Sequence, residues 1–131
     1  MGADQLVKYL VRANFQVDGT APLIPGVVEL RYVQNTGAAF SIFSQATWVL
    51  AVVSALVAAA LIVALQTKKV VHPLGRWPLA LVLAGAVGNL IDRALLGFVT
   101  DMFHPLFIDF ATFNVADICV VVGGIWLVLY A

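Results

Sequence analysis

Residues Trp48 to Leu65, WVLAVVSALVAAALIVAL, are almost purely aliphatic, and the chain has no charged residue from Ser41 to Thr67. A helix needs about 20 mostly apolar residues to cross a bilayer, because lipid offers the backbone no hydrogen-bond partners. The stretch therefore predicts a membrane-spanning helix at residues 46–67. Of the 131 residues, 63% are apolar and 11% are charged, against about 45–50% and about 25% in soluble domains, so lipid is the expected solvent.

Two further apolar runs predict spanning helices at residues 77–96 and 113–131. Strict alternation of apolar and polar residues is absent from all three runs, which favours helices over barrel strands. Residues 1–13 are amphipathic but too short and too charged to cross alone, so we expect an interfacial helix or the remnant of a truncated first span. The expected fold is an all-α integral membrane protein, a bundle with three complete spans that forms a single domain over residues 1–131.

The orientation of the spans follows from the positive-inside bias. Three of the seven Lys and Arg residues lie in the short connection at residues 68–76, namely Lys68, Lys69 and Arg76. This connection is expected in the cytoplasm, which places residues 14–45 and 97–112 outside the cell. The first of these external segments contains Val27 to Val33, whose partial alternation predicts a short strand, so the bundle is expected to carry a small extracytoplasmic β element.

Composition also excludes several classes of function. Seven basic residues balance seven acidic ones without a basic block, so nucleic-acid binding is not expected. Cys119 is the single cysteine, and His72 and His104 do not lie at ligand spacing from it. We therefore expect no metal site and no cofactor.

Ionisable side chains in or beside spanning helices are costly unless they are paired or hydrated, which makes each a functional candidate. Asn114 and Asp117 lie three residues apart and should share one helix face, and Asp117 is interpreted as functional. For the adjacent Asp92 and Arg93, the favoured interpretation is an ion pair that sets helix packing, formed either between the two or with another helix. Asp101 is either a loop carboxylate or a catalytic one.

Other polar residues have ordinary structural interpretations. His104 is expected at the interface, and Cys119 is expected in the core of its helix. Asn35 belongs either to a turn with Gly37 or to a site that hydrogen-bonds a peptide backbone. Gly85 and Gly88 share a stripe with Asn89, and their small size predicts close approach of a neighbouring helix.

Four segments of the chain together resemble the lipoprotein signal peptidases, the type II signal peptidases of bacterial membranes. In chain order they are Asp4-Gln5-Leu6-Val7-Lys8, Asn35-Thr36-Gly37-Ala38-Ala39-Phe40-Ser41, Gly88-Asn89-Leu90-Ile91-Asp92-Arg93 with Gly97-Phe98-Val99-Thr100-Asp101, and Phe113-Asn114-Val115-Ala116-Asp117. The resemblance covers nearly the whole chain, except that the family's apolar first span is all but absent before Asp4.

The resemblance implies an aspartyl endopeptidase that removes signal peptides from prolipoproteins by cutting before the diacylglyceryl-modified cysteine. It implies a catalytic pair, Asp101 and Asp117. It further implies substrate-binding or supporting residues, which are Asn35, Gly37, Asn89, Arg93, Asn114 and Ala116, and a structural motif of Asp4, Lys8, Gly88 and Asp92. The implied partners are the prolipoprotein, membrane lipid and globomycin-type inhibitors, and the implied location is the bacterial cytoplasmic (inner) membrane, with the site near the outer leaflet.

Two other functions remain open at this point. A small proton-coupled transporter or channel subunit would use Asp117, Asp92 and Arg93 as a relay, although the ionisable residues cluster at one end of the spans. A non-catalytic assembly factor would use the glycine faces to pack against partners, and it would tolerate replacement of Asp101.

Overall fold

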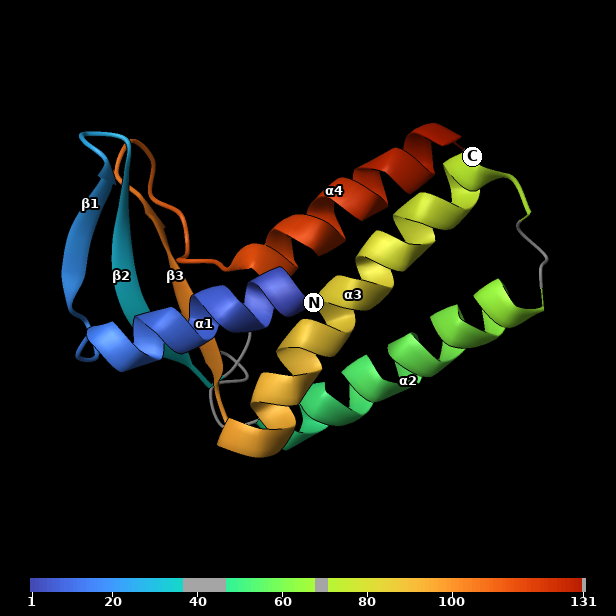
Figure 1. Ribbon diagram of the computed structural model, residues 1–131, viewed down its shortest axis with the longest axis horizontal. Coiled ribbons are helices and arrows are strands. Elements are labelled where there is room, and N and C mark those ends of the chain that lie inside the picture. Colours follow the sequence, from blue (N-terminus) through green and yellow to red (C-terminus); the bar gives the residue numbers. More distant parts are fainter. Residues whose placement is uncertain (37–46, 68–70, 131) are drawn as a thin grey trace.

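A computed structural model describes residues 1–36, 47–67 and 71–130. The described elements, in chain order, are α1 (Gly2–Asn14), β1 (Thr20–Ile24), β2 (Val28–Asn35), α2 (Thr47–Gln66), α3 (Pro73–Leu96), β3 (Val99–Pro105) and α4 (Val115–Tyr130). The sheet lies at one end of the molecule, and α2, α3 and α4 extend away from it (Figure 1). The protein is therefore mostly helical, with one small antiparallel sheet.

The sheet has the order β1-β2-β3, and both pairings are antiparallel. The predicted strand at Val27 to Val33 is confirmed as part of β2. The segment at residues 97–112, predicted as a loop, instead contains β3, which pairs Asn35 with Val99 and Val28 with Pro105. This pairing places Asp101 on a strand opposite Val33. A rigid strand positions a side chain more narrowly than a loop does.

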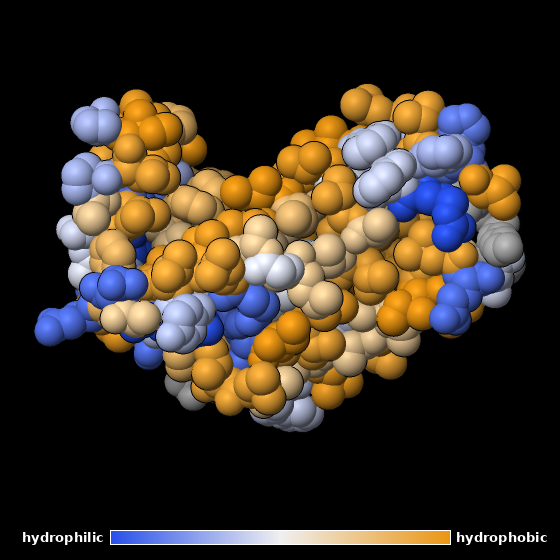
Figure 2. All heavy atoms as spheres, viewed as in Figure 1, coloured by the Kyte–Doolittle hydropathy of each residue, from blue (hydrophilic) through white to orange (hydrophobic). Residues whose placement is uncertain are grey.

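Two of the described helices are long and apolar enough to cross a membrane, Trp48–Gln66 within α2 and Pro73–Leu96. The predicted span at residues 46–67 thus corresponds to α2, of whose apolar window only 6% is buried inside the protein. A helix that is apolar all round and mostly unburied is suited to lipid. Apolar side chains also cover much of the visible surface over the helices (Figure 2).

The third predicted span is only partly matched. Helix α4 has 16 residues, which extend about 24 Å at about 1.5 Å per residue, less than the roughly 30 Å hydrocarbon core. The prediction of three complete spans is therefore not confirmed.

Helix α3 begins four residues earlier than predicted, at Pro73, because its start is well capped. His72 accepts a hydrogen bond from the backbone N–H of Leu74 at 3.1 Å, and Pro73 occupies the first turn, where its missing N–H costs nothing. The helix ends at Gly97, whose φ of 78° is left-handed and favours glycine. The predicted loop at residues 68–76 is thereby shortened, and Lys68 and Lys69 lie outside the described residues.

Helix α1 turns its polar stripe inward. Asp4 and Lys8 are 1% and 0% exposed, while Leu6, Tyr9 and Leu10 are exposed. The stripe follows the i, i+4 spacing of one helix face. The inward side meets polar groups of α3 and α4, so α1 is an inverted amphipathic helix whose outer face is apolar, as lipid contact would require.

Close packing of α3 and α4 depends on glycine, as the stripe through Gly85 and Gly88 predicts. A Cβ placed on Gly85 of α3 would lie 2.5 Å from the Ala116 carbonyl oxygen of α4, and one on Gly123 of α4 would lie 2.9 Å from the Pro78 carbonyl oxygen of α3. Neither distance is tolerable for a real Cβ. Glycine is therefore required at both positions.

Gly123→Ala should destabilise the fold by about 1–3 kcal/mol, the usual cost of overpacking, and should lower the melting temperature in detergent. Gly124→Ala is the matched control, since no atom lies within 4 Å of a Cβ there, and it gains the same helix propensity as the test variant. Equal melting temperatures for the two variants would contradict this account of the α3–α4 contact.

Candidate active site

Asp101 is buried at the middle of β3 and is 2% exposed. Its two carboxylate oxygens accept different donors: Oδ1 accepts from Asn114 Nδ2 at 2.8 Å, and Oδ2 accepts from Asn35 Nδ2 at 3.2 Å. Burial, followed by the nearby charge of Asp117, raises the pKa of Asp101 from 3.8 to about 7. Such a carboxyl group retains its proton at pH values where ordinary aspartates have lost theirs.

Asp117 lies in the first turn of α4 and is half-buried. Its Oδ2 accepts from the backbone N–H of Asn114 at 3.1 Å, while Asn114 Oδ1 accepts from the backbone N–H of Asp117 at 2.9 Å. This reciprocal pair is a capping box, which satisfies two backbone donors at the start of the helix. The helix N-terminus also favours a negative charge on Asp117.

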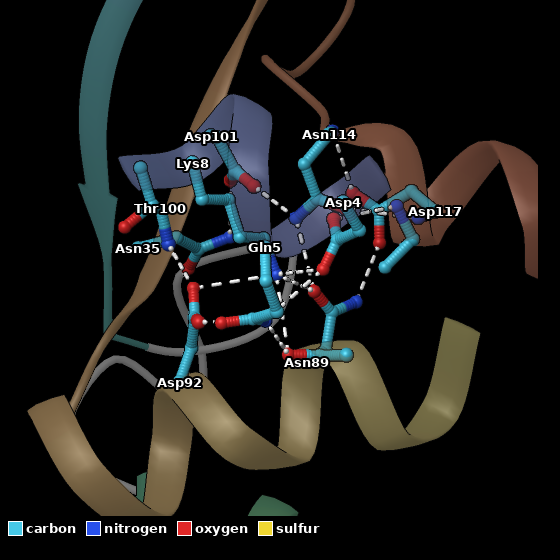
Figure 3. A network of polar contacts seen from close by, with 12 residues as sticks. Asp4, Gln5, Lys8, Asn35, Asn89, Asp92, Thr100, Asp101, Asn114 and Asp117 are labelled. Carbon is cyan, nitrogen blue, oxygen red and sulfur yellow. Dashed lines mark hydrogen bonds and ion pairs between the residues drawn. The ribbon is translucent and has the colours of Figure 1, made fainter. Parts of the chain in front are cut away.

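Asn114 and Asn89 connect the two aspartates (Figure 3). Asn114 Nδ2 donates to Asp101 Oδ1 and also, at 3.0 Å, to Asn89 Oδ1. Asn89 Nδ2 in turn donates to Asp117 Oδ1 at 2.9 Å. The prediction that Asn114 and Asp117 share a face is confirmed, and the two carboxylates belong to one continuous network of hydrogen bonds.

Lys8 joins this network through Asn89 and is fully buried. Its Nζ lies 2.9 Å from Asp4 Oδ2 and 3.3 Å from Asp92 Oδ2, and it donates to Asn89 Oδ1 at 3.0 Å. Because Asn89 Oδ1 receives both Lys8 and Asn114, its Nδ2 must point toward Asp117. The lysine thereby fixes the orientation of an amide that contacts Asp117.

The expected ion pair of Asp92 is confirmed in its cross-helix form, and a mutual pair with Arg93 is not formed. Asp92 pairs with Lys8 of α1, while Arg93 donates to Ser54 Oγ of α2 at 3.2 Å. Consecutive helical residues point about 100° apart and do not face each other. The two charges therefore join α3 to different neighbours.

Asp4 also anchors the start of α4. Its Oδ1 accepts from the backbone N–H of Ala116 at 2.9 Å, and the side chain of Ala116 packs beside Gly88. These contacts hold α1, α3 and α4 together directly under Asp117.

A cavity of about 670 Å³ opens beside Asp117. Apolar side chains of α2, α3 and α4 and residues 110–113 form most of its wall. Its polar lining includes Asp117, Asn35, Asn89, Arg93 and Ser54. Such a cavity suits a largely apolar ligand that is oriented by a few polar groups.

Most of the predicted site residues converge at this place. Those found in the network or the cavity lining are Asp4, Lys8, Asn35, Gly88, Asn89, Asp92, Arg93, Asp101, Asn114, Ala116 and Asp117. Gly37 lies outside the described residues.

Three further residues contribute to the network or the cavity lining and were not predicted from the sequence. Gln5 donates to Asp4, Asp92 and the Gly88 carbonyl, Thr100 donates its backbone N–H to Asp92, and Ser54 accepts from Arg93. Gln5 lies within the segment Asp4 to Lys8, and Ser54 is an isolated hydroxyl in an aliphatic helix. For both residues, this position in the sequence was the signal that could have indicated a role. Thr100 acts through its backbone, which a sequence does not reveal.

His104 lies on β3, half-buried, with its Nδ1 3.1 Å from Thr112 Oγ1. Cys119 is a free thiol on α4 and is half-buried. Within the described ranges, no group of three or more His, Cys, Asp or Glu residues is arranged to hold a metal ion.

Comparison with known proteins identifies the family. The family model described as signal peptidase (SPase) II matches residues 1–131. The chain belongs to this signal peptidase II family. A lipoprotein signal peptidase of Streptococcus pyogenes serotype M5 (strain Manfredo) is 42% identical over 126 residues, which cover 96% of this chain and 83% of that protein. The same values hold for the lipoprotein signal peptidase of serotype M18 (strain MGAS8232).

Two solved structures share the fold. One is described as a bacterial membrane enzyme structure determined by the in meso method at 2.3 Å; it gives a TM-score of 0.91 at 28% identity and covers 98% of this chain and 79% of that one. A second, described likewise at 1.9 Å, gives a TM-score of 0.88 at 28% identity and covers 98% and 84%. The fold shared with these membrane enzymes extends over almost the whole chain, and the signal peptidase II family is a protease family. The transporter alternative has no support from these comparisons.

Proposed function

We propose that this signal peptidase II removes signal peptides from diacylglyceryl-modified bacterial prolipoproteins, with Asp101 and Asp117 as its catalytic pair. The observation that carries the proposal is the bridge through Asn114. The side-chain amide of Asn114 donates a hydrogen bond to the carboxylate of Asp101, and its backbone N–H donates one to the carboxylate of Asp117. Two carboxyl groups held in one hydrogen-bonded network beside an apolar cavity are suited to peptide hydrolysis by acid–base chemistry.

The two aspartates have different surroundings, which supports different roles. Asp117, at a helix N-terminus, is the carboxylate that removes a proton from water, and the resulting hydroxide attacks the scissile carbonyl carbon. Asp101, whose pKa is raised to about 7, donates its proton to the carbonyl oxygen. As the tetrahedral intermediate collapses, Asp117 gives the proton it took from water to the leaving amine, and Asp101 recovers its proton from one of the two hydroxyl groups. One water is consumed, and no covalent enzyme intermediate forms.

The neighbouring residues are positioned to support this reaction. Asn35, Asn89 and Asn114 donate hydrogen bonds to the aspartates, and Arg93 lines the cavity. We assign them to holding the aspartates or the substrate, together with Gly37 and Ala116. Asp4, Lys8, Gly88 and Asp92 form the structural layer beneath.

The same elements support a proposal for the placement in the membrane. We propose that α2, α3 and α4 cross the bacterial cytoplasmic (inner) membrane, with the sheet outside and the connection at residues 68–76 inside. The site then lies near the outer leaflet, where a diacylglyceryl cysteine presents its peptide while its acyl chains stay in lipid. The apolar cavity is suited to these chains or to the signal peptide, and equally to an inhibitor of the globomycin type.

The proposal predicts a fall in activity at alkaline pH. Below pH 7 Asp101 holds its proton and acts as the acid; above pH 7 it loses this proton, since its pKa is about 7. We expect kcat/KM to fall about tenfold per pH unit on the alkaline side. A rate that stays constant from pH 7 to pH 9 in stopped assays would contradict the role assigned to Asp101.

The function itself is tested with matched substrates. The chain, reconstituted in lipid vesicles, is given one prolipoprotein with and without the diacylglyceryl group on its cysteine. We expect cleavage of the modified form only, with mass spectrometry placing the cut before that cysteine. Cleavage at another bond, or no preference for the modified form, would contradict the proposal.

A further inference from the structure

The end of the sheet at the β1–β2 turn is an exposed apolar surface, which we call the sheet tip. It consists of residues 22–28 (PLIPGVV) and 105–108 (PLFI), neither of which contains a charge. Its two segments are joined by the backbone N–H of Leu106, which donates to the Val27 carbonyl oxygen at 2.8 Å. Its large apolar side chains are each at least 40% exposed: Leu23, Ile24, Val27, Leu106, Phe107 and Ile108.

The opposite end of the same hairpin is polar. There Asp18 and Arg31 form an exposed ion pair at 3.6 Å, and Gln16 is exposed beside them. The sheet is therefore polarised along its strands, with charge at one end and apolar side chains at the other. This gradient is not required by the core, because the core cluster of Val11, Tyr32 and Met102 lies between the sheet and α1.

The sheet tip also has a defined position relative to the helices. The strands run across the direction of α3 and α4, and the β1–β2 turn lies at the end of the sheet on the side toward which α4 extends (Figure 1). In Figure 2 the sheet tip is apolar and stands across a hollow from the apolar surface of the helices. Exposure of apolar side chains to water costs roughly 25 cal/mol for each Å² of apolar surface. Contiguous exposed apolar patches therefore mark interaction sites.

We infer that the sheet tip inserts into the outer-leaflet boundary between lipid headgroups and acyl chains. Helices α2 and α3 are long and apolar enough to cross a membrane, and the sheet tip lies on the side of the sheet toward which the helices extend (Figure 1). The lack of charge at the sheet tip favours shallow apolar insertion over recognition of anionic headgroups. The inference rests on the proposed membrane placement, and it is independent of the catalytic pair.

Insertion would fix the height of Asp101 above the bilayer. Strand β3 begins at Val99 and ends at Pro105 in the sheet tip, and Asp101 lies between them. Two anchors, α3 at one end of β3 and lipid at the other, would hold this aspartate at the level where a lipid-linked peptide emerges.

The test uses an environment-sensitive fluorophore on single cysteines in a Cys119→Ser background. Ile24→Cys and Phe107→Cys report on the sheet tip, and Gln16→Cys on the charged end is the matched control. In phosphatidylcholine vesicles we expect blue-shifted emission and quenching by shallow spin-labelled lipids for both tip positions, and neither effect for position 16. Identical emission and identical access to a water-soluble quencher at all three positions would overturn the inference.

Two further measurements separate the alternative partners of the sheet tip. If protection of the tip positions from the water-soluble quencher grows with the protein-to-lipid ratio, the sheet tip contacts a second copy of the chain. If this protection is found only with anionic lipid, the sheet tip binds headgroups. Either result overturns shallow apolar insertion. In addition, Ile24→Ser with Phe107→Ser should slow cleavage more in vesicles than in detergent. Because fluorescence does not require turnover, failure of the insertion is distinguishable from failure of the proposed function.

Discussion

Replacing Asp101 by asparagine is expected to reduce cleavage of a diacylglyceryl prolipoprotein on the order of 10³-fold, as loss of a general acid does. Asparagine keeps the size of the side chain and an oxygen for Asn114, but it has no acidic proton to donate. Cleavage rates are to be measured at pH 6–7, where the parent holds that proton. Asp109→Asn is the matched control, because Asp109 is an exposed acid on the segment after β3, and it should leave the rate unchanged.

The same variant has a separate consequence for stability. The pKa of Asp101 is about 7 in the fold and about 3.9 in an unfolded chain, so the folded state binds this proton more tightly. The resulting stabilisation is complete below pH 4 and is lost as the pH rises through 7. At pH 8, Asp101→Asn should therefore melt no lower than the parent, and a large loss of stability there would attribute the lost activity to misfolding.

Replacing Lys8 by methionine is expected to destabilise the protein by about 3–5 kcal/mol, the usual cost of removing one partner of a buried ion pair. Methionine fills much of the same volume but leaves the carboxylates of Asp4 and Asp92 buried without their cation. It also frees Asn89 Oδ1 from one of its two donors. The melting temperature in detergent reports the loss of stability.

Two comparisons make the result specific to the buried charges. Arg12→Met removes a half-buried cation of the same helix that donates to Thr100, and it should cost much less. The double variant Lys8→Met, Asp4→Asn should recover part of the stability, because one unpaired charge is then absent. Equal losses for Lys8→Met and Arg12→Met would contradict the account.

Some of this fold and site was predictable from local sequence. The aliphatic run from Trp48 to Leu65 predicts α2 because length and composition alone determine a span. The spacing of Asn114 and Asp117 predicts a shared helix face, and the capping box follows from that spacing. The stripe through Gly85 and Gly88 likewise predicts close helix approach without knowledge of the partner helix.

Other features depend on partners far away in the chain. Strand β3 forms because it pairs with β2 about 70 residues earlier, so the burial of Asp101 has no local signal. Asp4 and Lys8 point into the protein because their partners lie on α3, and the sequence of α1 alone does not reveal this. For the same reason the sequence left open whether Asp92 and Arg93 pair with each other or with another helix, and α3 directs them to α1 and α2.

The central claim is that Asp101 and Asp117 act as one catalytic unit, and a double-mutant cycle tests it most directly. The cleavage rate of one diacylglyceryl prolipoprotein is measured for the parent, Asp101→Asn, Asp117→Asn and the double variant, all reconstituted in the same vesicles. Residues that act as a unit are strongly non-additive, so each single variant should be about as slow as the double one. Substantial activity in either single variant, or losses that multiply in the double variant, would contradict the claim.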